Sequence, residues 1–282
     1  MAVSAPAPAT PGAKAPGRAP RLGGGGLLRG IVMTYLSLVV LIPLAAVAWR
    51  SAGGGAGSFW RSVTAPEALA ALRLTFLAAL LVTAVNLVAG TAIAWVLARD
   101  EFPGRSVVNA LIDLPFALPT IVAGVTLLAL YGQHSPLGLN LAYTRAGVGL
   151  AMAFETLPFV VRAVQPVLLT MEPDMEEAAH CLGASQLATF RRVVLPVLSP
   201  AMLAGAALAF ARAVGEYGSV IFIAGNMPLK SEITPLLIMT KLEQYDYAGA
   251  TALGVVMLVA AFLLTLMVNL IQWWSSARHT AR

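Results

Sequence analysis

The sequence predicts an all-α, polytopic membrane protein with about six transmembrane helices. Hydrophobic residues make up 59% of its 282 residues, and charged residues only 11%. Soluble domains carry roughly 25% charged residues, so most of this surface must face lipid rather than water. The apolar residues also gather in long blocks, and the basic residues lie one or two at a time between those blocks, which is the distribution of a membrane protein rather than of a nucleic-acid binder.

Six apolar blocks are long enough to cross a bilayer, which takes about 20 residues of helix. They cover residues 27–49, about 72–98, about 107–131, about 148–169, about 194–224 and 248–273. Trp273 and Trp274 close the last block, where an interfacial aromatic belt is expected. We expect residues 1–26, rich in Ala, Pro and Gly, to be a disordered cytoplasmic tail, 27–71 to be the first span and an external loop, and 275–282 to be a cytoplasmic tail.

The first block has an alternative interpretation as a cleaved signal peptide, because Ala46, Val47 and Ala48 resemble a signal-peptidase site. Its length and the further apolar blocks favour a transmembrane helix. Basic residues are more numerous in the loops that lie inside when the N-terminus is inside, so we expect both termini in the cytoplasm. The same orientation places the polar stretch at about 171–192 on the cytoplasmic side.

This polar stretch predicts a short helix, a sharp turn and a second helix. Asp174 and Glu177 have the spacing of a capping box, and Gly183 can adopt the left-handed conformation that ends a helix. Ser185 can cap the second helix. The first helix has one apolar face, formed by Met175, Ala178, Ala179 and Leu182. A helix resting on the bilayer surface would show the same face, but the acidic cluster around it disfavours an anionic leaflet.

The residues of this loop resemble the EAA signature of type I ABC importer permeases. The resemblance rests on Glu177, Ala178, Ala179, Gly183, Leu195 and Pro196, with Val193 where isoleucine is common. It implies the type I permease fold for residues 72–274, in which this loop is the coupling helix that docks on a cytoplasmic ATPase. The chain contains no G-x-x-x-x-G-K-[ST] phosphate loop, so we expect ATP and Mg to be bound by the partner ATPase, with no cofactor and no enzymatic activity in this chain.

Three further segments resemble the CysT-type subunit of sulfate/thiosulfate importers: DLPFALPTIVAG at 113–124, AMAFETLPFVVRAVQP at 151–166 and GEYGSVIFIAGN at 215–226. The resemblance implies a bacterial inner-membrane location and four kinds of partner. These are a second, CysW-like permease, two copies of an ATPase, an extracytoplasmic sulfate/thiosulfate-binding protein and the lipid bilayer. Molybdate or a related oxyanion is the alternative substrate, and a secondary carrier driven by an ion gradient is the alternative class.

Several ionisable residues fall inside the predicted spans, where a charge costs about 3 kcal/mol or more and so should face the protein interior or a water-filled path. They are Asp113, Glu155, Arg162, Arg212 and Glu216. Arg212 and Glu216 are four residues apart on a helix and can pair, whereas Glu155 and Arg162 lie two turns apart on one face. Structural ion pairs and an arginine that attracts an anion are both open interpretations.

Helix-breaking residues also fall inside the spans, at Pro115, Pro119, Gly215 and Gly218, and we expect Pro158 and Pro166 to interrupt the fourth span. Breaks expose backbone amides, which can hold an oxyanion more gently than an arginine. We expect the third and fifth spans to line the path near their breaks, although kinks that only shape packing are the alternative. Cys181 excludes an internal disulfide, and the three histidines show no metal-ligand spacing, so no metal site is expected.

Overall fold

The computed structural model describes the backbone of residues 25–172 and 174–280, and side chains at 26–172, 174–267 and 270. The regular elements in these residues are all helical. The expected N-terminal tail and the side chains of Trp273 and Trp274 therefore lie outside the described part. Five helices are long and apolar enough to cross a membrane: Gly26–Ala52, Pro66–Arg99, Arg145–Thr170, Gln186–Val214 and Tyr247–Met267. A shorter apolar helix, Thr120–Tyr131, belongs to the remaining predicted span.

The chain up to Ala46 and the chain from Val47 onward form two separate compact units. The first unit holds α1 (Gly25–Leu36), a π-helical turn (Ser37–Leu41) and the start of α2 (Ile42–Ala52). A second π-helical turn, Phe190–Val194, precedes α11. Pro43 and Pro196 lie just after these two turns. Since proline lacks an amide proton and clashes with the carbonyl four residues earlier, a locally wider turn accommodates it without ending the helix.

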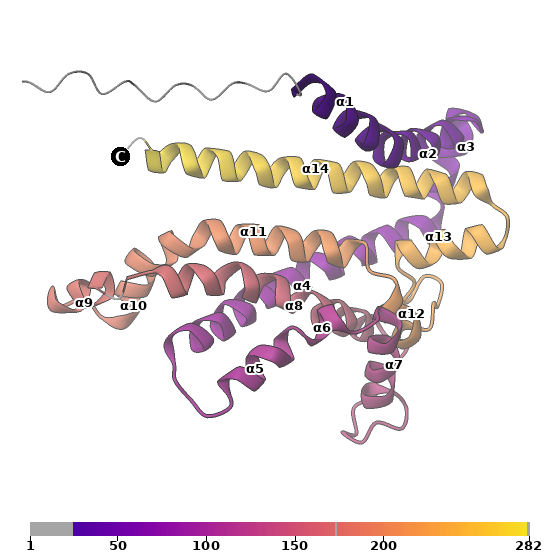
Figure 1. The fold of residues 1–282 in the computed structure, drawn as a ribbon. Coiled ribbons are helices and arrows are strands. Elements are labelled where there is room, and N and C mark those ends of the chain that lie inside the picture. The colour runs from indigo at the N-terminus through magenta and orange to yellow at the C-terminus, as the bar shows by residue number, and fades with distance from the viewer. Residues whose placement is uncertain (1–24, 173, 281–282) are drawn as a thin grey trace, which may run out of the picture. The chain divides into compact units, whose positions relative to one another are not determined.

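Three long helices form the centre of the second unit and lie side by side in Figure 1: α4 (Pro66–Arg99), α8 (Arg145–Thr170) and α11 (Leu195–Val214). Glycines let them approach closely, as small residues do in membrane helix packing. A Cβ atom on Gly90 would lie 2.9 Å from the Val160 side chain, and one on Gly205 would lie 3.1 Å from the Val160 Cα. The expectation that Pro158 and Pro166 interrupt the fourth span is wrong, because α8 is continuous through both.

The third predicted span is broken into α5 (Arg105–Ile112), α6 (Leu114–Ala117) and α7 (Thr120–Tyr131). Pro115 lies in the first turn of α6, and Pro119 immediately precedes α7. Both prolines thus stand where the fixed ring and missing amide are tolerated, at helix starts. The break predicted from these two residues is present.

The fifth predicted span is also broken, between α11 and α12 (Gly218–Ala224). The two breaks meet: α7 packs against α12, and a Cβ atom on Gly124 of α7 would lie 2.6 Å from the Ser219 carbonyl oxygen. Gly218 leaves room for the Thr120 side chain in the same way. These two discontinuous spans, which we call the broken third and fifth crossings, therefore form one compact region beside α8.

The remaining helices are α3 (Gly55–Thr64), α13 (Thr234–Glu243) and α14 (Tyr247–Thr280), together with the short loop helices α9 (Asp174–Cys181) and α10 (Gln186–Thr189). α3 and α13 lie in segments for which the sequence predicted no helix. α14 continues to Thr280, which lies inside the segment expected to be a C-terminal tail. Within the second unit, α9 and α10 lie at one end of the central helices and α13 lies at the other (Figure 1).

Candidate functional site

The polar loop between α8 and α11 forms the predicted helix–turn–helix. Gly183 has a φ of +82°, and its amide donates to the His180 carbonyl, so the chain turns sharply after α9. A residue other than glycine would be strained at this angle. The Ser185 hydroxyl then accepts a hydrogen bond from the amide of Ala188 and caps α10. The second helix continues through the π-helical turn into α11, so the loop is joined directly to a long central helix.

The loop is anchored to the end of α4. Arg99 donates to the Glu176 carboxylate at 2.5 Å, and its guanidinium lies 6.0 Å from the centre of the Trp95 ring. Trp95 also packs edge-on against Phe190 of the π-helical turn, with ring centroids 5.8 Å apart. Both ends of the loop are thus fixed to the same helix end, and α9 is held in a defined position.

The outer face of this loop carries apolar side chains with nothing packed over them. The exposed fractions of Met175, Leu182 and Leu187 are 43%, 89% and 66%. Of the predicted docking residues, Glu177, Ala178, Gly183 and Pro196 are exposed, and Ala179 and Leu195 are half-buried. Exposed apolar groups rimmed by polar ones mark surfaces that contact another protein or a membrane. The exposure of these residues is what the predicted ATPase-docking role requires, and that role stays a prediction.

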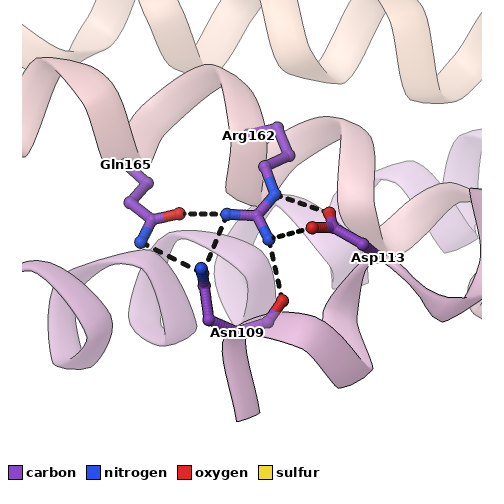
Figure 2. A network of polar contacts seen from close by, with 4 residues as sticks. All are labelled: Asn109, Asp113, Arg162 and Gln165. Atoms are coloured by element: carbon purple, nitrogen blue, oxygen red, sulfur yellow. Dashed lines mark hydrogen bonds and ion pairs between the residues drawn. The ribbon is translucent and has the colours of Figure 1, made fainter. Parts of the chain in front are cut away.

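Arg162 lies at the centre of a polar network between α8 and the broken third crossing (Figure 2). Its Nε and Nη2 donate to the two Asp113 carboxylate oxygens at 2.7 and 2.6 Å. Its remaining N–H groups reach the Asn109 side-chain and backbone oxygens, both at 2.8 Å, and the Gln165 side-chain oxygen at 2.6 Å. All five guanidinium donors are occupied.

This network also completes the end of α5. The amide of Asp113 donates to the Ala110 carbonyl rather than to that of Asn109, so the Asn109 carbonyl lacks its usual helical partner. The Nη2 group of Arg162 supplies that hydrogen bond. Arg162 therefore fastens the broken crossing to α8.

A second polar group joins α8, α11 and α12. Arg212 pairs with Glu216, as the spacing predicted, and its Nη2 lies 3.5 Å from the Glu155 carboxylate. Glu216 is fully buried, and its other oxygen accepts hydrogen bonds from the Ser219 amide at 2.9 Å and hydroxyl at 2.8 Å. Glu216 thereby caps α12 just after the break. One carboxylate oxygen of the buried Glu155 has no hydrogen-bond partner among the described residues.

Most of the ion pairs in these two networks join residues far apart in the sequence, which spacing along one helix did not indicate. Glu155 and Arg162, which share a helix face, do not pair with each other. Glu155 contacts Arg212 of α11, and Arg162 pairs with Asp113, which lies between α5 and α6. Asn109 and Gln165 complete the Arg162 network and were not predicted, because uncharged amides in an apolar block give no distinct signal. Both intramembrane arginines make ion pairs in this structure.

Other features bear on binding at the opposite end of the unit. A cavity of about 790 Å³ lies between α4 and the first half of α8 and has a mostly apolar lining. Arg73 and Arg145 are its charged lining residues, and sequence analysis did not single them out as site residues. Among the described residues, no group of three His, Cys, Asp or Glu side chains is placed to hold a metal ion.

Comparison with known proteins agrees with this architecture. Residues 87–279 match the family described as binding-protein-dependent transport system inner membrane component. The sulfate transport system permease protein CysT of Synechocystis sp. is 48% identical over 251 residues, which cover 86% of this chain and 88% of that protein. CysT of Escherichia coli is 44% identical over 250 residues, which cover 86% of this chain and 90% of that protein.

Solved structures share the fold at much lower identity. A bacterial ABC transporter involved in the import of alginate matches with a TM-score of 0.72 at 14% identity, over 88% of this chain and 95% of that one. The MetNI methionine ABC transporter, in an inward-facing conformation, matches with a TM-score of 0.57 at 16% identity, over 78% and 99%. The chain is a multi-pass membrane component of a transport system, and it belongs to the binding-protein-dependent transport system inner membrane component family and, within it, to the CysT permeases.

Proposed function

We propose that this chain is a permease subunit of an ATP-driven importer and forms the membrane pathway for sulfate and thiosulfate. The observation that carries the proposal is the identity of 44–50% to CysT permeases of sulfate transport systems over most of both chains. Identity at this level over most of both chains supports a common fold and a common function.

The polar loop between α8 and α11, at residues 171–192, is called the docking loop below. It supports the coupling part of the proposal. Its exposed apolar residues would be covered by a cytoplasmic ATPase that binds the ATP and Mg. Since α9 is anchored to α4 by Arg99 and joined to α11 through the loop, movement of the ATPase would displace both helices together. In this proposal the chain forms the membrane pathway and transmits the movement of the ATPase to its helices. ATP hydrolysis by the partner supplies the energy.

The remaining partners follow from the same assignment. The complex would contain a second, CysW-like permease, two copies of the ATPase and an extracytoplasmic sulfate/thiosulfate-binding protein. The α9 end of the second unit would face the cytoplasm, with both chain termini on that side of the bacterial inner membrane, and the α13 end would face the binding protein.

In this proposal the polar groups inside the bundle hold the helices together and do not bind the anion. Arg162 and Arg212 are already engaged by carboxylates. The amide of Ser219 at the start of α12 is engaged by Glu216, so a carboxylate already stands where an anion could bind the helix end. The predicted roles of Pro115, Pro119, Gly215 and Gly218 in the pathway stay predictions. In this structure Gly218 leaves room for the Thr120 side chain where α12 contacts α7.

The test is uptake of radiolabelled sulfate by cells that lack this gene, with and without its restoration. We expect restoration to rescue uptake, excess thiosulfate to compete, and excess molybdate to have little effect. Competition by molybdate alone would assign a different oxyanion. Rescue that persists in cells lacking the partner ATPase would contradict the importer class and favour an ion-driven carrier.

A further inference from the structure

The charged end of the α4–α8 cavity has properties that the buried arginines lack. Arg73 lies two turns into α4, and Arg145 is the first residue of α8, so both stand toward the α13 end of the bundle. Both are exposed and both line the same cavity. Neither has a carboxylate within ion-pair distance among the described residues. The two guanidinium groups therefore present unneutralised positive charge at one end of one cavity.

Arg145 is held in place without being neutralised. Its Nε donates to the backbone carbonyl of Lys230 at 3.1 Å, so this bond uses one of its five N–H groups. The Lys230 loop is itself well defined, because the Met227 carbonyl accepts hydrogen bonds from the amides of Lys230, Ser231 and Glu232. The two terminal nitrogens of Arg145 have no acceptor among the described residues. Together these nitrogens can bind one oxyanion through two parallel hydrogen bonds.

We propose that Arg73 and Arg145 form a capture site for the tetrahedral oxyanion at the external mouth of the pathway. This inference rests on the proposed function and specifies where the transported dianion first meets this chain. A guanidinium binds an oxyanion in a bidentate manner, and two of them from different helices match the charge of a dianion. Because both arginines are exposed, the anion keeps part of its hydration and is held weakly enough to be released.

The rest of the cavity lining explains why the anion would stop at the mouth. Below the two arginines the lining is apolar, formed by residues that include Leu77, Leu81 and Val85 of α4 and Leu150 and Ala153 of α8. Such a surface offers no hydrogen bonds to replace lost hydration, so passage requires a rearrangement of the helices. Weak capture at the mouth is therefore compatible with passage that is gated by the ATPase.

The experiment uses the complete transporter in proteoliposomes, with ATP inside and the loaded binding protein outside at a concentration below saturation. The variants are Arg73→Gln, Arg145→Gln and the double variant. Arg61→Gln is the matched control, because Arg61 is an exposed arginine of α3 that does not line the cavity. We expect sulfate uptake to fall about threefold for each single variant and about tenfold for the double variant, as for exposed charge contacts. The control should transport like the wild type.

Two further readouts separate this site from other roles of the arginines. ATP hydrolysis stimulated by the binding protein should be unchanged in the double variant; an equal fall in hydrolysis and uptake would assign the arginines to docking of that protein and overturn the proposal. Anionic phospholipid retained by the purified complex should also be unchanged, and its loss without a change in uptake would assign the site to lipid headgroups. If wild-type proteoliposomes carry sulfate but the double variant matches Arg61→Gln, the capture site is wrong while the proposed function stands. If the wild type carries no sulfate, the proposed function itself fails.

Discussion

Replacing Arg162 by methionine should loosen the broken third crossing from α8. The change keeps a side chain of similar length but removes the ion pair to Asp113 and the hydrogen bond to the Asn109 carbonyl. Breaking a fully buried ion pair costs about 3–5 kcal/mol, whereas an exposed pair contributes about 0–1 kcal/mol. The side chains of Arg162 and Asp113 are 29% and 49% exposed, which lies between these cases. We therefore expect a loss of about 2 kcal/mol in the free energy of unfolding.

A double-mutant cycle tests whether the cost comes from this pair. Asp113→Leu alone should destabilise the protein because it leaves Arg162 with uncharged partners only. The double variant, with Arg162→Met and Asp113→Leu together, should lose much less than the sum of the two single changes, because it leaves neither charge unpaired.

The assay is unfolding of the purified chain in mixed detergent with increasing sodium dodecyl sulfate, followed by circular dichroism. Arg191→Met is the control, since Arg191 is exposed and surface changes typically shift stability by no more than about 0.5 kcal/mol. The reasoning is refuted if Arg162→Met unfolds together with this control, or if the two single effects simply add in the double variant.

Three other predictions concern different parts of the fold. Gly124→Ala should destabilise the chain by about 1–3 kcal/mol, because its Cβ would press on the Ser219 backbone, whereas Gly215→Ala, whose nearest atom would lie 3.7 Å away, should be tolerated; thermal unfolding of the two variants compares them directly. Burial, and then the charge of Glu67, raise the pKa of the Glu232 carboxyl, so its ionised form costs stability above the folded-state pKa. Glu232→Gln should therefore stabilise the protein at pH 7, with a gain that disappears as the pH falls below about 4.5, and a pH-independent difference would argue against this cause. Ala178→Arg should abolish co-purification of the ATPase while leaving the unfolding curve unchanged, and His134→Arg, in the outer loop, is the control. If the ATPase still co-purified with the Ala178→Arg variant, or was lost equally with His134→Arg, α9 would not be part of the docking surface.

The parts of the fold that sequence predicted well are those set by local chemistry. Gly183 and Ser185 determine a turn and a cap through their own backbone and hydroxyl, so the shape of the docking loop was readable from a few residues. Pro115 and Pro119 marked the broken third crossing in the same way. Pro158 was misleading because packing of α8 between α4 and α11 keeps the helix continuous, and such packing is not visible in a single segment.

The candidate site was predicted only as a set of residues, because its pairing depends on tertiary structure. Arg162 and Asp113 are 49 residues apart and come together only when the broken crossing folds back against α8. The spacing of Arg212 and Glu216 indicated their pairing, although Glu216 lies just beyond the end of α11, in the break before α12. The approach of Glu155 from α8 could not be inferred. The cavity arginines were missed for a related reason: the positive-inside rule counts basic residues by side and does not indicate which of them share a cavity.

The connection from the docking loop to the polar centre follows from the continuity of α11. This helix of 20 residues is about 30 Å long, begins at the π-helical turn and ends at the break before α12. The helix between these two irregular segments is continuous, with Pro200 inside it. Its last turn carries Arg212, which contacts Glu155 of α8 directly. Glu216, in the break that follows, pairs with Arg212 and caps α12. A displacement of the docking loop would therefore reach the contact between α7 and α12 through one continuous helix, whose end is joined to α8 and α12 by the contacts of Arg212 and Glu216.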